Sequence, residues 1–106
     1  MIQELTLDNF EEAINQEEPI LVDFWATWCG PCMMQGEVLH TIAKQHPNLR
    51  IGKVNVDENS QLAAKFRIEA IPTMMIFQSG TCMEEVTGLR QEAQVLDLFC
   101  RYGGKL

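Results

Sequence analysis

Two cysteines separated by two residues have the clearest chemical potential in this sequence. Cys29 and Cys32 enclose a Gly-Pro dipeptide within the segment WATWCGPCMMQGEV at positions 25–38. An apolar, strand-like segment precedes the pair, and a segment with helical character follows it. If that helix begins near Pro31, Cys29 is its N-cap residue and Cys32 lies in its first turn, on the same side. The two Cα atoms then come within the ~4.4–6.8 Å that a disulfide requires.

The start of a helix makes the two sulfurs unequal. Its free N–H groups and partial positive charge stabilise a thiolate at Cys29, whereas Cys32 is farther inside and should stay protonated longer. Gly30 allows a sharp turn, and Pro31 suits the first turn because its missing N–H would have no partner there. Such a pair can reduce disulfides: the outer thiolate forms a mixed disulfide, which the inner thiol then resolves.

A structural disulfide and a metal site are the other uses of such a pair. Zinc needs two further ligands, and His40 would lie roughly 12 Å from Cys32 along the helix. Cys82 and Cys100 stand alone in separate predicted elements, where we expect them to pack as small apolar residues. We therefore predict no bound metal, with a zinc site or an iron–sulfur cluster as the alternative. In a reducing compartment, an isolated C-x-x-C is more often catalytic or metal-binding than structural.

The elements that must position the pair alternate between strand and helix. Strands are predicted at 2–5, 20–27, 49–56, 73–78 and 82–87, and helices at 31–45, 61–66 and 91–102. A further helix near residue 10 would be capped by Thr6 or Asp8, and the helix at 61–66 by Asn59 or Ser60. Strand–helix–strand units imply parallel pairing, and the last two strands form a hairpin. The predicted fold class is α/β, with one mixed sheet and helices on both faces.

Composition and net charge limit the domain count and the classes of partner that are expected. The chain has 106 residues, 46% of them hydrophobic and 22% charged, which is typical of a single globular domain, here spanning 1–106. A net charge of −7 argues against nucleic acid and membranes as partners. No apolar run approaches the ~20 residues of a membrane helix, and the first residues lack the pattern of a secretory signal. We therefore expect a cytoplasmic protein.

A carboxylate interrupts the most apolar predicted strand. Asp23 lies within ILVDFWA, and a buried charge is costly unless it is paired or neutralised. Burial would raise the pKa of Asp23 and make it a proton acceptor near neutral pH. The alternative is that Asp23 is only partly buried, or that it forms a structural pair with Lys53.

The sequence around the cysteine pair resembles the thioredoxin family. FWATWCGPC at 24–32 is similar to the family's active-site signature, and LVDFWA, KVNVD, the IPT tripeptide at 71–73, the Ser79-Gly80 turn and Gly88 follow in the family's order and spacing. The resemblance covers essentially the whole chain. It implies a thioredoxin fold with a five-stranded mixed β-sheet and four α-helices. It also implies a protein dithiol–disulfide oxidoreductase that serves electron transport and cell redox homeostasis.

The resemblance also implies site residues. Cys29 is similar to the family's nucleophile, Cys32 to its resolving thiol and Pro72 to its cis-proline, and a Cys29–Cys32 disulfide is the implied oxidised form. Asp23 is similar to the acid beneath the resolving cysteine, and Lys53 to the partner of that acid. The implied substrate-binding residues are Trp28, Gly30, Pro31, Ala70, Ile71, Thr73, Gly88 and Leu89.

Partners are implied as well. Electrons would come from a thioredoxin reductase, flavin- or ferredoxin-linked, with no cofactor bound to the chain. The substrates would be disulfide-containing proteins, and the chain would act as a monomer. The alternative is a non-catalytic binding subunit or co-chaperone with the same fold, against which the intact CGPC motif, Pro72 and Asp23 argue.

Several positions depart from the family's pattern. Met33 stands where a basic residue is usual and Glu37 where a helix-kinking proline is usual, while Ala70 often is glycine. Losing the charge should alter docking, and losing the proline should leave the helix straighter unless Gly36 permits a bend. Met33 is either a soft apolar lip of the groove or a plain surface residue.

Three other methionines are predicted to be core residues. Met34 is expected to pack inward from its helix. Met74 and Met75 are neighbours in a predicted strand, so they should point to opposite faces of the sheet.

Overall fold

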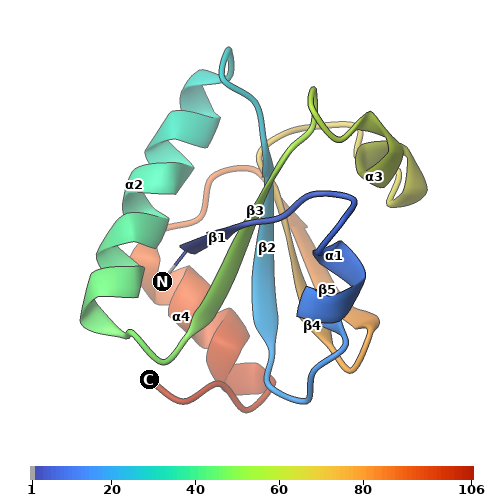
Figure 1. Cartoon of the computed structure of the whole chain (residues 1–106). Coiled ribbons are helices and arrows are strands. Elements are labelled where there is room, and N and C mark those ends of the chain that lie inside the picture. The colour runs from blue at the N-terminus through green and yellow to red at the C-terminus, as the bar shows by residue number, and fades with distance from the viewer. Residues whose placement is uncertain (1) are drawn as a thin grey trace.

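The computed structural model describes residues 2–106, which form one sheet covered by helices on both faces (Figure 1). In chain order the elements are β1 (Ile2–Glu4), α1 (Phe10–Ile14), β2 (Ile20–Trp25), α2 (Gly30–Gln45), β3 (Arg50–Asn55), α3 (Ser60–Lys65), β4 (Thr73–Gln78), β5 (Thr81–Thr87) and α4 (Glu92–Arg101). The strand order is β1-β3-β2-β4-β5. β1 and β2 pair with β3 in parallel, whereas β4 pairs antiparallel with β2 and β5. The predicted mixed sheet with a terminal hairpin is confirmed.

The central strand β2 sends its side chains alternately to two cores. Val22 and Phe24 pack with residues of α1 and α3, whereas Leu21 packs with residues of α2 and α4. In Figure 1, α1 and α3 lie on one side of the sheet and α2 and α4 lie on the opposite side. A strand covered on both faces requires an almost continuous apolar run, as β2 has. By the same alternation, Asp23 lies on the face covered by α2 and α4.

The two short helices begin without the predicted side-chain caps, although Asn59 is the N-cap residue of α3, as predicted. The residue before α1 is Asn9, and its side-chain oxygen accepts from the N–H of Thr6 at 2.8 Å instead of capping the helix. Thr6 Oγ1 in turn accepts from the N–H of Asp8 at 3.2 Å. The residue before α3 is Asn59, whose amide donates to the carbonyl of Asn55 at 3.1 Å. Local turn contacts therefore use the groups that the sequence pattern assigned to caps.

The methionine predictions are partly confirmed. Met74 packs against the α2 and α4 side and Met75 against the α1 and α3 side, as expected for neighbours in a strand. Met34, however, is 55% exposed, so the prediction that it packs inward is wrong. Counted from the buried Cys32, positions three and four along a helix share its face, whereas position two does not. Gln35 and Gly36 occupy that buried side.

The prediction that Cys82 and Cys100 pack in the core is also wrong, because both are exposed. Cys82 lies on the edge strand β5, and Cys100 lies on the outward side of α4, whose buried residues are Val95, Leu98 and Phe99. Partial burial of the sulfur, and then the charge of Glu85, raise the pKa of the Cys82 thiol above its ordinary value. A thiol with a raised pKa holds less reactive thiolate at neutral pH.

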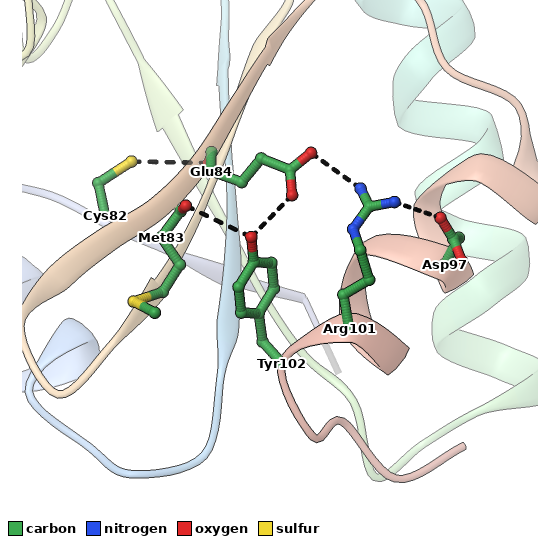
Figure 2. A network of polar contacts seen from close by, with 6 residues as sticks. All are labelled: Cys82, Met83, Glu84, Asp97, Arg101 and Tyr102. Carbon is green, nitrogen blue, oxygen red and sulfur yellow. Dashed lines mark hydrogen bonds and ion pairs between the residues drawn. The ribbon is translucent and has the colours of Figure 1, made fainter.

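A polar network joins edge strand β5 to the end of α4 (Figure 2). Glu84 accepts from the guanidinium of Arg101 and from the hydroxyl of Tyr102, each at 2.8 Å. Arg101 also pairs with Asp97, one turn earlier in α4. The network lies on the surface and links the last helix to the edge of the sheet. Within residues 2–106, no helix is both long and apolar enough to cross a membrane.

Candidate active site

Cys29 and Cys32 are joined as a disulfide at the start of α2, with their Cα atoms 5.2 Å apart. Cys29 is the N-cap residue and has extended backbone angles, and its Sγ accepts from the N–H of Cys32 at 3.2 Å. The predicted capping geometry is therefore confirmed. Cys29 keeps 6% of its surface exposed and Cys32 none, so the expected difference in shielding is also present.

The end of β2 and the first turn of α2 hold the disulfide in place. The N–H of Cys29 donates to the carbonyl of Ala26 at 3.3 Å, which turns the chain directly after the strand. Ala26 and both cysteines form a small buried cluster that contacts Trp25 and Ile71. Gly30 and Pro31, in the first turn, are exposed. A strand buried in two cores thus ends in a short turn that holds the pair just beneath the exposed Gly30 and Pro31.

A second loop reaches the disulfide from the start of β4. The Ile71-Pro72 peptide bond is cis, as the resemblance implied. The carbonyl oxygen of Ile71 lies 3.8 Å from Cys29 Sγ. The carbonyl of Pro72 accepts from the N–H of Gly88 at 2.8 Å. The structure therefore brings together the cysteine pair, the cis-proline loop and the loop that follows β5.

The implied groove residues share this end of the sheet but differ in exposure. Ala70 is exposed, and Ile71, Gly88 and Leu89 are half-buried. Thr73 is buried, with a hydroxyl that donates to the carbonyl of Ala70 at 2.6 Å. Its side chain therefore supports the loop from within instead of facing solvent.

Trp28 projects from the turn before Cys29 and is 70% exposed. Its indole N–H donates to Asp57 Oδ2 at 2.9 Å, which holds the ring against the loop after β3. Met33, on the first turn of α2, is 42% exposed. Large apolar side chains that stay exposed beside a reactive group are typical of a surface that receives a partner.

Asp23 lies in β2 on the α2 side of the sheet and is fully buried. Neither of its carboxylate oxygens has a hydrogen-bond partner among the described residues. Burial raises the pKa of Asp23 from 3.8 to about 7, and the positive charge of Lys53 opposes that rise. The alternative of a partly buried Asp23 is therefore wrong.

Lys53 is the neighbour of Asp23 in the adjacent strand β3. Its Nζ lies 4.3 Å from the centre of the Trp25 ring. A Cβ at Gly36 would lie 3.4 Å from the same nitrogen, so the ammonium group rests against α2. The lysine thus acts on Asp23 through its charge, while its ammonium group rests against an aromatic ring and a helix.

Sequence reasoning missed Gln35. Its side chain is fully buried, its Nε2 donates to the carbonyl of Arg90 at 3.0 Å, and its Oε1 accepts from the N–H of Arg90 at 2.8 Å. The available signal was its position three residues after Cys32, on the helix side that also carries Leu39 and Ile42. A polar residue on a buried helical stripe requires partners.

A hollow on the surface lies apart from the predicted site residues. A hollow of about 520 Å³ is lined by residues 17–19, 47–50 and 102–105 together with Gln78, none of which belongs to the predicted site. The Gln78 amide already donates to the carbonyls of Glu17 and Tyr102. In the part of the chain that the structure describes, no three His, Cys, Asp or Glu residues gather as metal ligands would.

Comparison with known proteins agrees with the geometry. The family model described as thioredoxin matches residues 1–100. A thioredoxin of Alicyclobacillus acidocaldarius is 41% identical over 92 residues, covering 86% of this chain and 88% of that protein. A bifunctional thioredoxin reductase/thioredoxin of Mycobacterium leprae is 42% identical over 88 residues, covering 82% of this chain and 19% of that protein.

A solved structure supports the same assignment. A mutant thioredoxin of Halobacterium salinarum superposes with a TM-score of 0.88 at 32% identity, covering 99% of this chain and 93% of that one. With its disulfide at the start of α2, this chain belongs to the thioredoxin family and is a dithiol–disulfide oxidoreductase.

Proposed function

We propose that Cys29 is the nucleophile and Cys32 the resolving thiol in the reduction of protein disulfides. The observation that carries this assignment is the asymmetry of the pair: Cys29 caps the helix and keeps some exposure, whereas Cys32 has none. The Cys29 thiolate attacks one substrate sulfur, the substrate disulfide breaks, and a mixed disulfide forms. Cys32 then attacks Cys29 Sγ, the substrate leaves as a dithiol, and the pair is left oxidised with two electrons transferred.

Asp23 accepts the proton that Cys32 must lose before this second attack, directly or through water. A carboxyl whose pKa is raised to about 7 can take and release a proton near neutral pH. Lys53 keeps that pKa from rising further, so that the carboxylate form remains accessible. The buried carboxylate of Asp23 has no hydrogen-bond partner in the described part of the chain, which supports this role, because a purely structural carboxylate would have one.

The substrate chain lies across the surface formed by the three segments around the disulfide. We assign its contacts to Trp28, Gly30, Pro31, Ala70, Ile71, Thr73, Gly88 and Leu89, with Pro72 facing the cysteine pair. The proximity of the Ile71 carbonyl to Cys29 Sγ, 3.8 Å, supports this assignment. Thr73 would contribute through its backbone, since its hydroxyl is used within the loop.

The electron donor would be a thioredoxin reductase. The name of the Mycobacterium leprae relative joins the two activities in one protein, which supports such a partner for this chain. That reductase would be either flavin-linked or ferredoxin-linked. The chain would act as a cytoplasmic monomer with no resident cofactor.

Insulin reduction by dithiothreitol tests the cysteine roles. Wild type should accelerate the reaction, whereas Cys29→Ser and Cys32→Ser should not, and Cys32→Ser alone should accumulate a mixed disulfide with insulin. Cys82→Ser and Cys100→Ser are the matched controls and should behave as wild type. Inactive wild type would instead favour a binding subunit, and a mixed disulfide trapped through Cys32 would reverse the two roles.

A further inference from the structure

The buried amide of Gln35 pairs with both backbone groups of Arg90, a residue far away in the sequence. Its Nε2 donates to the Arg90 carbonyl at 3.0 Å, and its Oε1 accepts from the Arg90 N–H at 2.8 Å. The side-chain amide thus forms the same pair of hydrogen bonds with Arg90 that the backbone of a neighbouring β-strand would form. Two such bonds fix the separation and the orientation of the two backbones, which apolar packing alone does not.

Arg90 ends the loop that carries two of the assigned groove residues. The guanidinium of Arg90 folds back on the same loop, with Nη1 at 3.4 Å from the Gly88 carbonyl and 3.3 Å from the Leu89 carbonyl. Gly88 in turn donates to the carbonyl of Pro72. Arg90 is therefore the point at which the loop is fastened to helix α2.

The other end of this link is one helical turn after Cys32. The remaining large buried side chains on this side of α2, Leu39 and Ile42, are apolar and pack in the core. A methionine or leucine could fill the place of Gln35 without the cost of burying an amide. The amide therefore contributes something that packing does not, namely a defined distance between the cysteine pair and the loop 88–90.

We propose that Gln35 is a positioning residue for protein substrates. It holds the loop 88–90 so that a substrate backbone bound there presents its disulfide to Cys29. The proposal rests on the groove assigned under the proposed function. A small-molecule disulfide needs no groove, so it should not depend on Gln35.

The test compares two substrates with wild type, Gln35→Met and Ile42→Val. Methionine has the length of glutamine but no strong donor or acceptor, and Ile42→Val weakens the same helix without touching the loop. For Gln35→Met, kcat/KM for insulin should fall about tenfold, mainly through a higher KM, as expected for the loss of two hydrogen bonds. The rate with hydroxyethyl disulfide should not change, and Ile42→Val should leave both rates unchanged. Gln35→Leu should repeat the pattern if Gln35→Met folds poorly.

Hydrogen exchange of the Arg90 amide provides the second readout. Exchange should be slow in wild type and in Ile42→Val, and fast in Gln35→Met. Equal losses with both substrates, or an unchanged KM for insulin despite fast Arg90 exchange, would overturn the proposal. A wild type that reduces neither substrate would refute the proposed function itself, which is a separate result.

Discussion

Asp23 lies on the strand that leads to the disulfide and Gln35 on the helix that begins there, and both are fully buried polar side chains, yet their surroundings are opposite. Asp23, in the central strand, finds no hydrogen-bond partner for either oxygen among residues 2–106. Gln35, on the helix that begins at the disulfide, uses both ends of its amide on one backbone residue. A buried group without a partner changes its protonation, whereas a buried group with partners holds structure. We therefore assign chemistry to the first region and positioning to the second.

The largest expected effect is on stability when Asp23 is replaced. Its pKa rises from 3.8 to about 7 on folding, so the folded chain disfavours the carboxylate. A raised folded pKa means that stability is lost as pH rises from about 4 to about 7 and stays lost above that. A difference of about 3 in pKa corresponds to about 4 kcal/mol. Asp23→Asn should therefore unfold at higher denaturant concentration above about pH 8, with little gain near pH 4.

The same substitution should slow catalysis. Without a proton acceptor for Cys32, insulin turnover of Asp23→Asn at about pH 7 should fall by up to about a hundredfold. Stopped-flow measurement of mixed-disulfide resolution locates the loss. A slower first attack with unchanged resolution would assign Asp23 to Cys29 instead.

Gln35→Ala should give the next largest change in stability. Loss of two hydrogen bonds and of the packed side chain should cost about 2–3 kcal/mol. Because the amide does not titrate, this cost should be the same at about pH 5 and about pH 8. Urea unfolding at both pH values checks this difference from Asp23. If the loss of stability in Gln35→Ala changed with pH, the two buried side chains would not differ in the way proposed.

Lys53→Met sharpens the account of Asp23. The positive charge opposes the effect of burial, so its removal should raise the Asp23 pKa above its value of about 7. Carboxyl NMR titration and the pH profile of insulin reduction should both move to higher pH. An unchanged midpoint would mean that the lysine serves packing against Trp25 alone.

The smallest effect is expected at the surface network in Figure 2. Arg101 pairs with Glu84 and Asp97, but its side chain is 46% exposed. Exposed ion pairs are worth about 0.2–1 kcal/mol and are screened by salt. Arg101→Gln should thus lower stability by about 0.5 kcal/mol, less so at high salt, and leave insulin reduction unchanged. A loss as large as that of Gln35→Ala would mean that this network, too, is structural.

The sequence predicts most of the fold and the chemistry because both depend on local patterns. The apolar run of β2 requires cover on both faces, and the cysteine spacing places two sulfurs on one helical turn. Asp23 was recognisable because a charge within such a run is costly. In each of these cases, the residue type and its neighbours in the sequence are sufficient for the prediction.

The errors and omissions share a physical cause. Gln35 is explained only by Arg90, and no local pattern relates residues so distant in the sequence. Thr6 and Asn9 could each satisfy a helix start or a turn, and the fold chooses the turn. Cys82 is exposed on β5, which is an edge strand with a neighbouring strand on one side only, and hydrophobicity alone does not reveal which strand lies at the edge.

The most direct test of the central claim is the titration of Asp23 in the oxidised protein. With Cys29 and Cys32 joined, no thiol titrates beside it, and carbon NMR of the labelled carboxyl reports its protonation alone. The account predicts a midpoint at about 7. A midpoint near the ordinary aspartate value of about 4 would show a solvated or paired carboxylate and contradict its role as the proton acceptor.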